Sequence, residues 1–302
     1  MHQHDTESII PNLVNIGVRL IPISLHLLGI YLLSIVPKQN INATQRLLLL
    51  NLSFVTVSFL LCTWLASLIH VLFPSSHFEF LEYISLVQLT GFSFVYYLAM
   101  ICITADRFLE MYLNIKYALY WSGRHTLKLM YFIWLIGATF SSVMVILYYK
   151  WRINYTRYCY IYFFPIIEAI FLAIALVTYS YIFGRYYKPL KVLKNRKKDF
   201  KNMLRRSPLL LISLIIVTFV LFMIVPDMIL FSYHYSNTSL PNTVLLVTYI
   251  LYTLTYTSDA VIYILLQKSV RKVAKRKFHI RKRAVTVERP RQGTITSAQS
   301  NL

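Results

Sequence analysis

The chain has 302 residues, of which 57% are hydrophobic and 16% aromatic, and it carries a formal net charge of +20. This apolar content exceeds the roughly 45–50% of an average soluble domain, so an ordinary soluble globular protein is excluded in favour of a helical protein with several membrane spans. The sequence contains no Gly-x-Ser-x-Gly, His-Glu-x-x-His or paired-aspartate motif and no cysteine cluster. We therefore expect neither an enzyme nor a protein with a metal or cofactor.

Seven apolar stretches are long enough to cross a bilayer, which takes about 20 mostly apolar residues. We find no internal repeat, which argues against a transporter. The sequence therefore predicts an all-α membrane protein, with an N-terminal segment over 1–9 and a seven-transmembrane helix bundle over 10–266. The predicted spans are 10–36, 44–73, 84–112, 125–149, 160–187, 207–234 and 242–266.

Two further segments follow the seventh span. Within 267–283, Val270, Val273 and Phe278 are spaced so that a short amphipathic helix can lie in the membrane interface with its cationic face toward the headgroups. Residues 284–302 are polar and are predicted to form a disordered cytoplasmic tail.

Lys and Arg are distributed unequally between the two sides of the predicted bundle. Residues 188–206 hold nine of them and residues 268–291 hold eleven. Because positively charged loops stay in the cytoplasm, we predict a multi-pass protein of the plasma membrane with its N-terminus outside, which places 27 of the 31 Lys and Arg residues inside. We expect these basic runs to contact anionic membrane lipid and a cytoplasmic protein partner, and not nucleic acid.

Glycosylation sequons agree in part with this orientation. Asn154-Tyr-Thr and Asn237-Thr-Ser fall in predicted outer loops, so Asn154 and Asn237 are candidate glycosylation sites and the chain a candidate glycoprotein.

Six of the spans contain short motifs: NLSFVT at 51–56, ITADRF at 103–108, IWLIG at 133–137, VTYSYIF at 177–183, MIVP at 223–226 and DAVIY at 259–263. In their order and spacing, over roughly residues 10–280, they resemble the motifs of the rhodopsin-like (class A) G-protein-coupled receptors. The resemblance implies a receptor whose switch toward the G protein consists of Asp106, Arg107, Tyr179, Pro226, Asp259 and Tyr263.

The resemblance also implies how the switch works. Asp106 and Arg107 neutralise each other at rest, because an isolated charge at membrane depth is costly. When helix six moves outward, Arg107 extends toward Tyr179 and Tyr263, and the new cleft admits a Gα subunit of a heterotrimeric G protein. Arg206 stands where many family members carry an acid that holds helix six shut, so we predict ligand-independent activity.

The chain departs from the family at several motif positions. Thr56 replaces the helix-two Asp, so we expect no sodium site, and Glu82 stands at the place of the helix-three cysteine, which leaves Cys159 without a partner. Ile224 replaces a Trp, and Asp259-Ala260 replaces Asn-Pro. A second interpretation therefore stays open: a non-coupling or decoy seven-span protein, such as a scaffold or channel subunit.

Candidate ligand-binding residues lie in the outer halves of the spans. Two acids, Glu168 and Asp227, occur there, and intramembrane carboxylates are functional candidates by default. Asp227 either pairs with a cationic or polar ligand group or is satisfied internally by Arg19, a His or tyrosine hydroxyls. Helical spacing from Arg107 adds one inward stripe of the third span, and other residues can face Asp227 from helices two and seven. These are Leu89, Phe92, Ser93 and Tyr96 on the stripe, and His70, Tyr249, Thr253 and Tyr256 opposite.

Overall fold

The computed structural model describes residues 2–37, 41–73, 79–113, 116–151, 158–193, 208–265, 267 and 269–277. Among these residues there are helices and no strand, and seven helical segments are long and apolar enough to cross a membrane. The predicted fold class, an all-α bundle of seven membrane-spanning helices, is thereby confirmed, and the chain is a multi-pass membrane protein.

The spans are built from α-helices and, in four of them, from π-helical segments that carry the label η. The first two spans are α1 (His2–Ile35) and α2 (Ala43–Leu72), and the third combines α3 (Glu79–Val87), η2 (Gln88–Phe92) and α4 (Ser93–Leu113). A short helix, α5 (Tyr117–Tyr120), precedes the fourth span, α6 (Gly123–Trp151). The last three spans are η4 (Cys159–Phe163) with α8 (Phe164–Leu193); α10 (Pro208–Phe219), η5 (Val220–Ile224) and α11 (Val225–Ser236); and α12 (Asn242–Asp259) with η6 (Ala260–Leu265).

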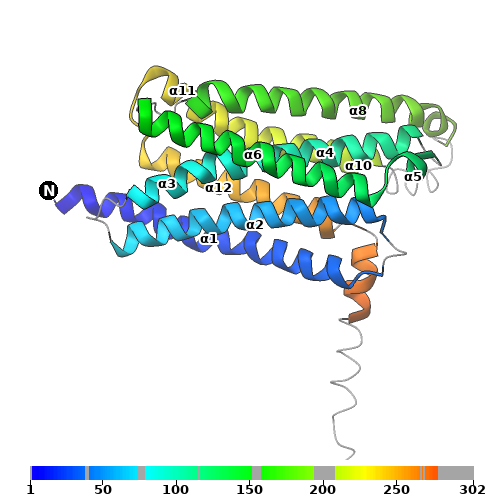
Figure 1. The fold of residues 1–302 in the computed structure, drawn as a ribbon, viewed down its shortest axis with the longest axis horizontal. Coiled ribbons are helices and arrows are strands. Elements are labelled where there is room, and N and C mark those ends of the chain that lie inside the picture. Colours follow the sequence, from blue (N-terminus) through cyan, green and yellow to red (C-terminus); the bar gives the residue numbers. More distant parts are fainter. Residues whose placement is uncertain are drawn as a thin grey trace, which may run out of the picture.

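The seven spans run side by side along the long axis of the molecule (Figure 1). Helix α1 packs against α2 and α12, whereas α4 packs against α2, α6 and α8 and so occupies the middle of the bundle. We call the end that holds the N-terminus, α3 and α11 the N-terminal end, and the end with α5 and residues 269–277 the tail end (Figure 1).

The outer surface of the bundle is apolar, as contact with lipid requires. Helix α6 shows this most clearly, since Tyr131, Leu135 and Phe132 are 69%, 64% and 59% exposed. On its inner side Trp134 donates a hydrogen bond of 2.9 Å to the side-chain oxygen of Asn51 in α2. In lipid, helices associate through such packing and hydrogen bonds and not through exclusion of water.

The π-helical segments change the direction in which side chains point. A π-helix bonds residue i to i+5, so it adds one residue to a turn and shifts the phase of all residues beyond it. The segment η2 lies where the third span meets α6, and η5 ends directly before Val225 and Pro226. Periodicity arguments that assume an unbroken α-helix therefore fail across these segments.

Helices α4 and α6 approach each other closely at Gly137. A Cβ atom at this position would lie 2.3 Å from Cγ2 of Val95, a stiff β-branched side chain. We expect Gly137→Ala to lower the melting temperature of the purified protein, because overpacking of a tight contact costs about 1–3 kcal/mol. Gly17→Ala is the matched control, since a Cβ there meets no atom within 4 Å. Equal melting temperatures for both variants would contradict the close approach.

Residues 269–277 form a helix after the seventh span, within the predicted 267–283. Val270 is fully buried and Val273 packs against the core, whereas Lys277 donates a 2.7 Å hydrogen bond to the hydroxyl of Tyr31 in α1 and lies 5.0 Å from its ring centroid. This helix is thus attached to the first span. Phe278 and the tail over 284–302 lie outside the described residues.

Candidate functional site

A cavity of about 260 Å³ lies toward the N-terminal end of the bundle. Six of the seven spans contribute to its wall, and α6 does not. Aromatic and polar side chains dominate the lining: Arg19, Phe59, Thr63, Ser85, Gln88, Leu89, Ser93, Tyr97, Tyr160, Phe164, Met223, Asp227, Tyr249, Tyr252 and Tyr256.

Two buried carboxyl groups meet at one side of this cavity, and we call Glu168 and Asp227 the acid pair. They are 4% and 5% exposed and both lie beside the hydroxyl of Tyr97. The Tyr97 hydroxyl lies 2.9 Å from Oε1 of Glu168 and 3.3 Å from Oδ2 of Asp227, and Tyr252 donates to Oδ1 of Asp227. Two carboxylates that share one hydroxyl donor repel each other, and this repulsion favours a proton on one of them and a single negative charge for the acid pair.

Arg19 of α1 lies in the wall of the same cavity but does not pair with Asp227. Its Nε donates to the side-chain oxygen of Asn15, whose amide donates in turn to Ser67 at 2.9 Å. An ion pair between Arg107 and Glu110 lies far from Arg19, at the tail end. Of the internal partners that the sequence suggested for Asp227, the tyrosine hydroxyls bind it, and Arg19 does not.

Several predicted ligand-binding residues line the cavity and others do not. Glu168 lies behind the Tyr97 hydroxyl and does not line it. Thr253 donates to the Tyr249 carbonyl oxygen at 2.8 Å, and His70 lies in the last turn of α2, also outside the lining. The predicted residues that do lie on the cavity wall are Leu89, Ser93, Asp227, Tyr249 and Tyr256.

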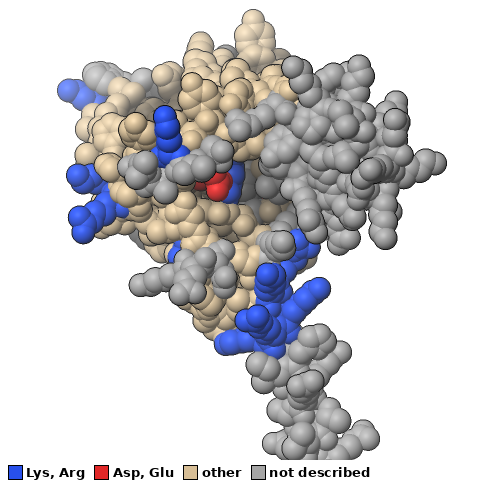
Figure 2. Space-filling model, turned by 90° about the vertical axis from the view of Figure 1, so that its right-hand side faces the viewer, with Lys and Arg blue, Asp and Glu red and all other residues tan. Residues whose placement is uncertain are grey.

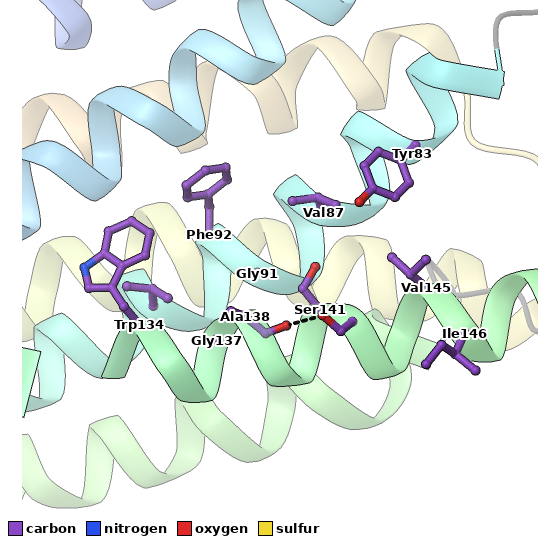
Figure 3. A pocket seen from close by; sticks show the side chains of 12 residues that line it. Tyr83, Val87, Gly91, Phe92, Trp134, Gly137, Ala138, Ser141, Val145 and Ile146 are labelled. Atoms are coloured by element: carbon purple, nitrogen blue, oxygen red, sulfur yellow. Dashed lines mark hydrogen bonds between the residues drawn. The ribbon is translucent and has the colours of Figure 1, made fainter. Parts of the chain in front are cut away.

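Phe92 departs from the predicted inward stripe. It lines a separate groove of about 470 Å³ between the third span and α6, where its ring lies 6.1 Å from that of Trp134 (Figure 3). Gly91, Gly137 and Ser141 form the floor of this groove between Phe92 and Trp134 at one end and Tyr83 at the other (Figure 3). Phe92 is the last residue of η2, and Leu89 and Ser93 on either side of it do line the cavity.

Tyr96 points away from the cavity, toward the tail end. Its hydroxyl donates to Oδ2 of Asp259, the last residue of α12, which is only 3% exposed. The Tyr96 ring also meets the rings of Tyr97 at 5.8 Å and Tyr256 at 5.5 Å, both edge-on. Tyr96 is therefore a link between residues of the cavity wall and the start of η6.

At the tail end, the predicted pair of Asp106 with Arg107 is not formed. Asp106 accepts a hydrogen bond from Tyr117 of α5, and Nη1 of Arg107 lies 2.9 Å from Oε2 of Glu110. Successive residues on a helix point about 100° apart, whereas residues i and i+3 share a face, so Glu110 is the better partner. Burial and the hydrogen bond to Asp106 raise the pKa of the Tyr117 hydroxyl.

Figure 2 looks onto this tail end. Lys and Arg side chains project around its rim, and acidic atoms lie beside basic atoms in a central hollow. The described basic residues of this end include Arg124, Lys128, Lys272 and Lys275, all exposed. The described part of this surface thus carries several exposed cations and a small acidic region near its centre (Figure 2).

The remaining predicted residues are placed as follows. Tyr179 packs with Met111 beside the buried Ile182, and its ring stacks on Phe183 at 6.2 Å. Pro226 is buried in the first turn of α11, and Asn237 ends that helix in the left-handed region, exposed, with φ 56°. The backbone of Tyr263 lies in η6, but its side chain is not among those that the structure describes. Asn154 lies outside the described residues. Cys159 is buried and forms no disulfide.

No protein-family model matches this sequence, and no curated protein matches it either. A functional assignment therefore depends on the sequence motifs and on the arrangement of residues in the bundle.

Proposed function

We propose that this protein is a receptor of the rhodopsin-like type, which converts binding of an extracellular ligand into activation of a heterotrimeric G protein. The observation that carries the proposal is that one central span reaches both candidate sites. In α4, Tyr97 contacts the acid pair at the cavity, whereas Asp106 and Arg107 stand at the tail end. A ligand in the cavity and a protein at the tail end would thus act on the same helix.

A continuous set of contacts supports coupling between the two ends. Asp227 and Tyr256 of the cavity wall contact Tyr97 and Tyr96 respectively, and Tyr96 bonds Asp259 at the start of η6. A ligand that displaces α11 relative to α4 changes the first of these contacts and biases the others. Coupling of this kind needs two arrangements with different ligand affinity, and a packed polar network provides such discrete alternatives.

The π-helical segments support the proposal where the sequence motifs are incomplete. In the receptor family, prolines bend the fifth and seventh spans. Here Ala260 occupies the proline position of the seventh span and Phe171 that of the fifth; η6 begins at Ala260, and η4 precedes Phe171. Both prolines and π-helical turns are sites where helices bend, so we propose that these two segments take the place of the missing prolines.

The proposed orientation places the N-terminal end outside the plasma membrane and the tail end in the cytoplasm. The positive rim of the tail end suits anionic lipid headgroups of the inner leaflet, which attract Lys and Arg (Figure 2). We propose that the Gα subunit docks at this end, where Arg107 and Glu110 lie partly exposed.

The proposal is tested by basal recruitment of a panel of engineered Gα probes in living cells. Wild type is compared with Arg107→Ala at matched surface expression. We expect wild type to recruit one Gα class and the variant to recruit at least ten-fold less of it. A ten-fold difference corresponds to about 1.4 kcal/mol of coupling free energy. Recruitment by neither form, at good surface expression, would favour the alternative of a non-coupling seven-span protein.

A further inference from the structure

We propose that the cavity takes a small organic oxyanion, a ligand whose carboxylate or phosphate oxygens bind Nη1 of Arg19. This inference rests on the proposed receptor function only in that it treats the cavity as the ligand site. It goes beyond that function because it names the chemistry of the ligand and the residue that recognises it.

Arg19 is an incompletely satisfied buried cation. Arg19 is only 5% exposed, and it lines the cavity. Its Nε donates to Asn15, but Nη1 is buried and has no hydrogen-bond partner in the part of the chain that the structure describes. A guanidinium group has five N–H donors, and buried donors without acceptors are rare in folded proteins.

No carboxylate forms an ion pair with Arg19 among the side chains that the structure describes. Its Cζ lies 5.8 Å from the ring centroid of Tyr249, and the other titratable groups near it are the phenols of Tyr256 and Tyr160. Asn15 and the Ser67 behind it are neutral. An uncompensated charge at membrane depth is unfavourable by several kcal/mol, and an oxyanion with two oxygens is the partner that matches a guanidinium best.

The acid pair sets a second requirement for the ligand. Asp227 lines the same cavity and carries, with Glu168, a single negative charge that Tyr97 and Tyr252 stabilise. A second anionic group on the ligand would be repelled there, whereas an amine or hydroxyl group could donate to Asp227. The volume of about 260 Å³ limits the ligand to a small molecule, since drug-sized sites span roughly 300–1,000 Å³.

A purely structural role and a ligand-binding role for Arg19 predict opposite effects of its substitution on stability. If the chain from Arg19 through Asn15 to Ser67 serves only to hold α1 against α2, its loss destabilises the protein. If Arg19 is retained for a ligand, the empty protein carries an unfavourable charge, and removal of that charge stabilises it, as is common at binding sites.

The first measurement is therefore the melting temperature of the purified, ligand-free full chain. We expect Arg19→Gln, which keeps an amide donor for Asn15, to melt at a higher temperature than wild type. Arg124→Gln is the matched control, because Arg124 is exposed at the tail end, and its melting temperature should not change. A lower melting temperature for Arg19→Gln overturns the proposal.

The second measurement adds sodium butyrate or sodium phosphate as probes, with sodium chloride keeping the ionic strength constant. We expect a saturable rise of several degrees in wild type with at least one probe, and none with Arg19→Gln. A response to butyrate alone identifies a carboxylate ligand, and a response to phosphate alone identifies a phosphate. No Arg19-dependent rise with either probe overturns the proposal. Neither measurement involves a G protein, so failure of Gα recruitment with intact anion binding would reject the coupling alone.

Discussion

Tyr97→Phe is expected to lower the free energy of unfolding by about 2–3 kcal/mol, the cost of removing a hydrogen bond to a buried charged group. The Tyr97 hydroxyl is fully buried and lies within hydrogen-bond distance of both members of the acid pair. The substitution keeps the ring and its packing, so the loss measures the hydroxyl alone. Asp227 would keep Tyr252 as a donor, whereas Glu168 would lose its tyrosine donor.

The melting temperature of the purified protein reports this loss. Tyr131→Phe is the matched control, because the Tyr131 side chain projects from the outer face of α6 and is 69% exposed. A second variant, Glu168→Gln, replaces the carboxyl group of one member of the pair with an amide, which can itself serve as a donor to Asp227. We expect Tyr97→Phe to be less damaging in that background, and equal losses with and without Glu168→Gln would show that Tyr97 does not stabilise the acid pair.

The seven spans could be predicted from the sequence because lipid leaves few alternatives. In hydrocarbon every backbone polar group needs an internal partner, so long apolar runs can only be helices. Asp227 was identifiable for a related reason, since an acid within such a run stands out against its neighbours. Tyr249 and Tyr256 followed because residues at i and i+7 share a face of a regular α-helix such as α12.

The π-helical segments could not be predicted, because hydropathy does not distinguish i→i+4 from i→i+5 bonding. The stripe counted back from Arg107 is right for Leu89 and Ser93, which line the cavity, and wrong for Phe92, which faces α6. The sequence suggests Arg19 as a partner of Asp227, but an isolated cation within an apolar run is itself a candidate binding group. Tyr97 was missed because the assumed stripe passed through its neighbour Tyr96.

The contacts at the tail end revise the expected resting state of the proposed receptor. Arg107 is held by Glu110 of its own helix and not by Asp106, which Tyr117 occupies. Arg206, which stands where many family members carry the acid that holds helix six shut, lies outside the described residues. The one acid that the structure places against Arg107, among the residues it describes, is therefore Glu110, which would restrain Arg107 from extending into a cleft.

Glu110→Gln is accordingly expected to raise basal Gα recruitment in cells. The ion pair is partly exposed, at 22% and 44% for the two side chains, so its contribution is about 0.5–1 kcal/mol and the expected rise about two- to five-fold. The double variant Glu110→Gln with Arg107→Ala should recruit no more than Arg107→Ala alone, because the released arginine is the group that acts. A rise that persists in the double variant would mean that Glu110 influences the tail end independently of Arg107. Unchanged recruitment in the single variant, at equal surface expression, would show that the helix-internal pair does not restrain the switch.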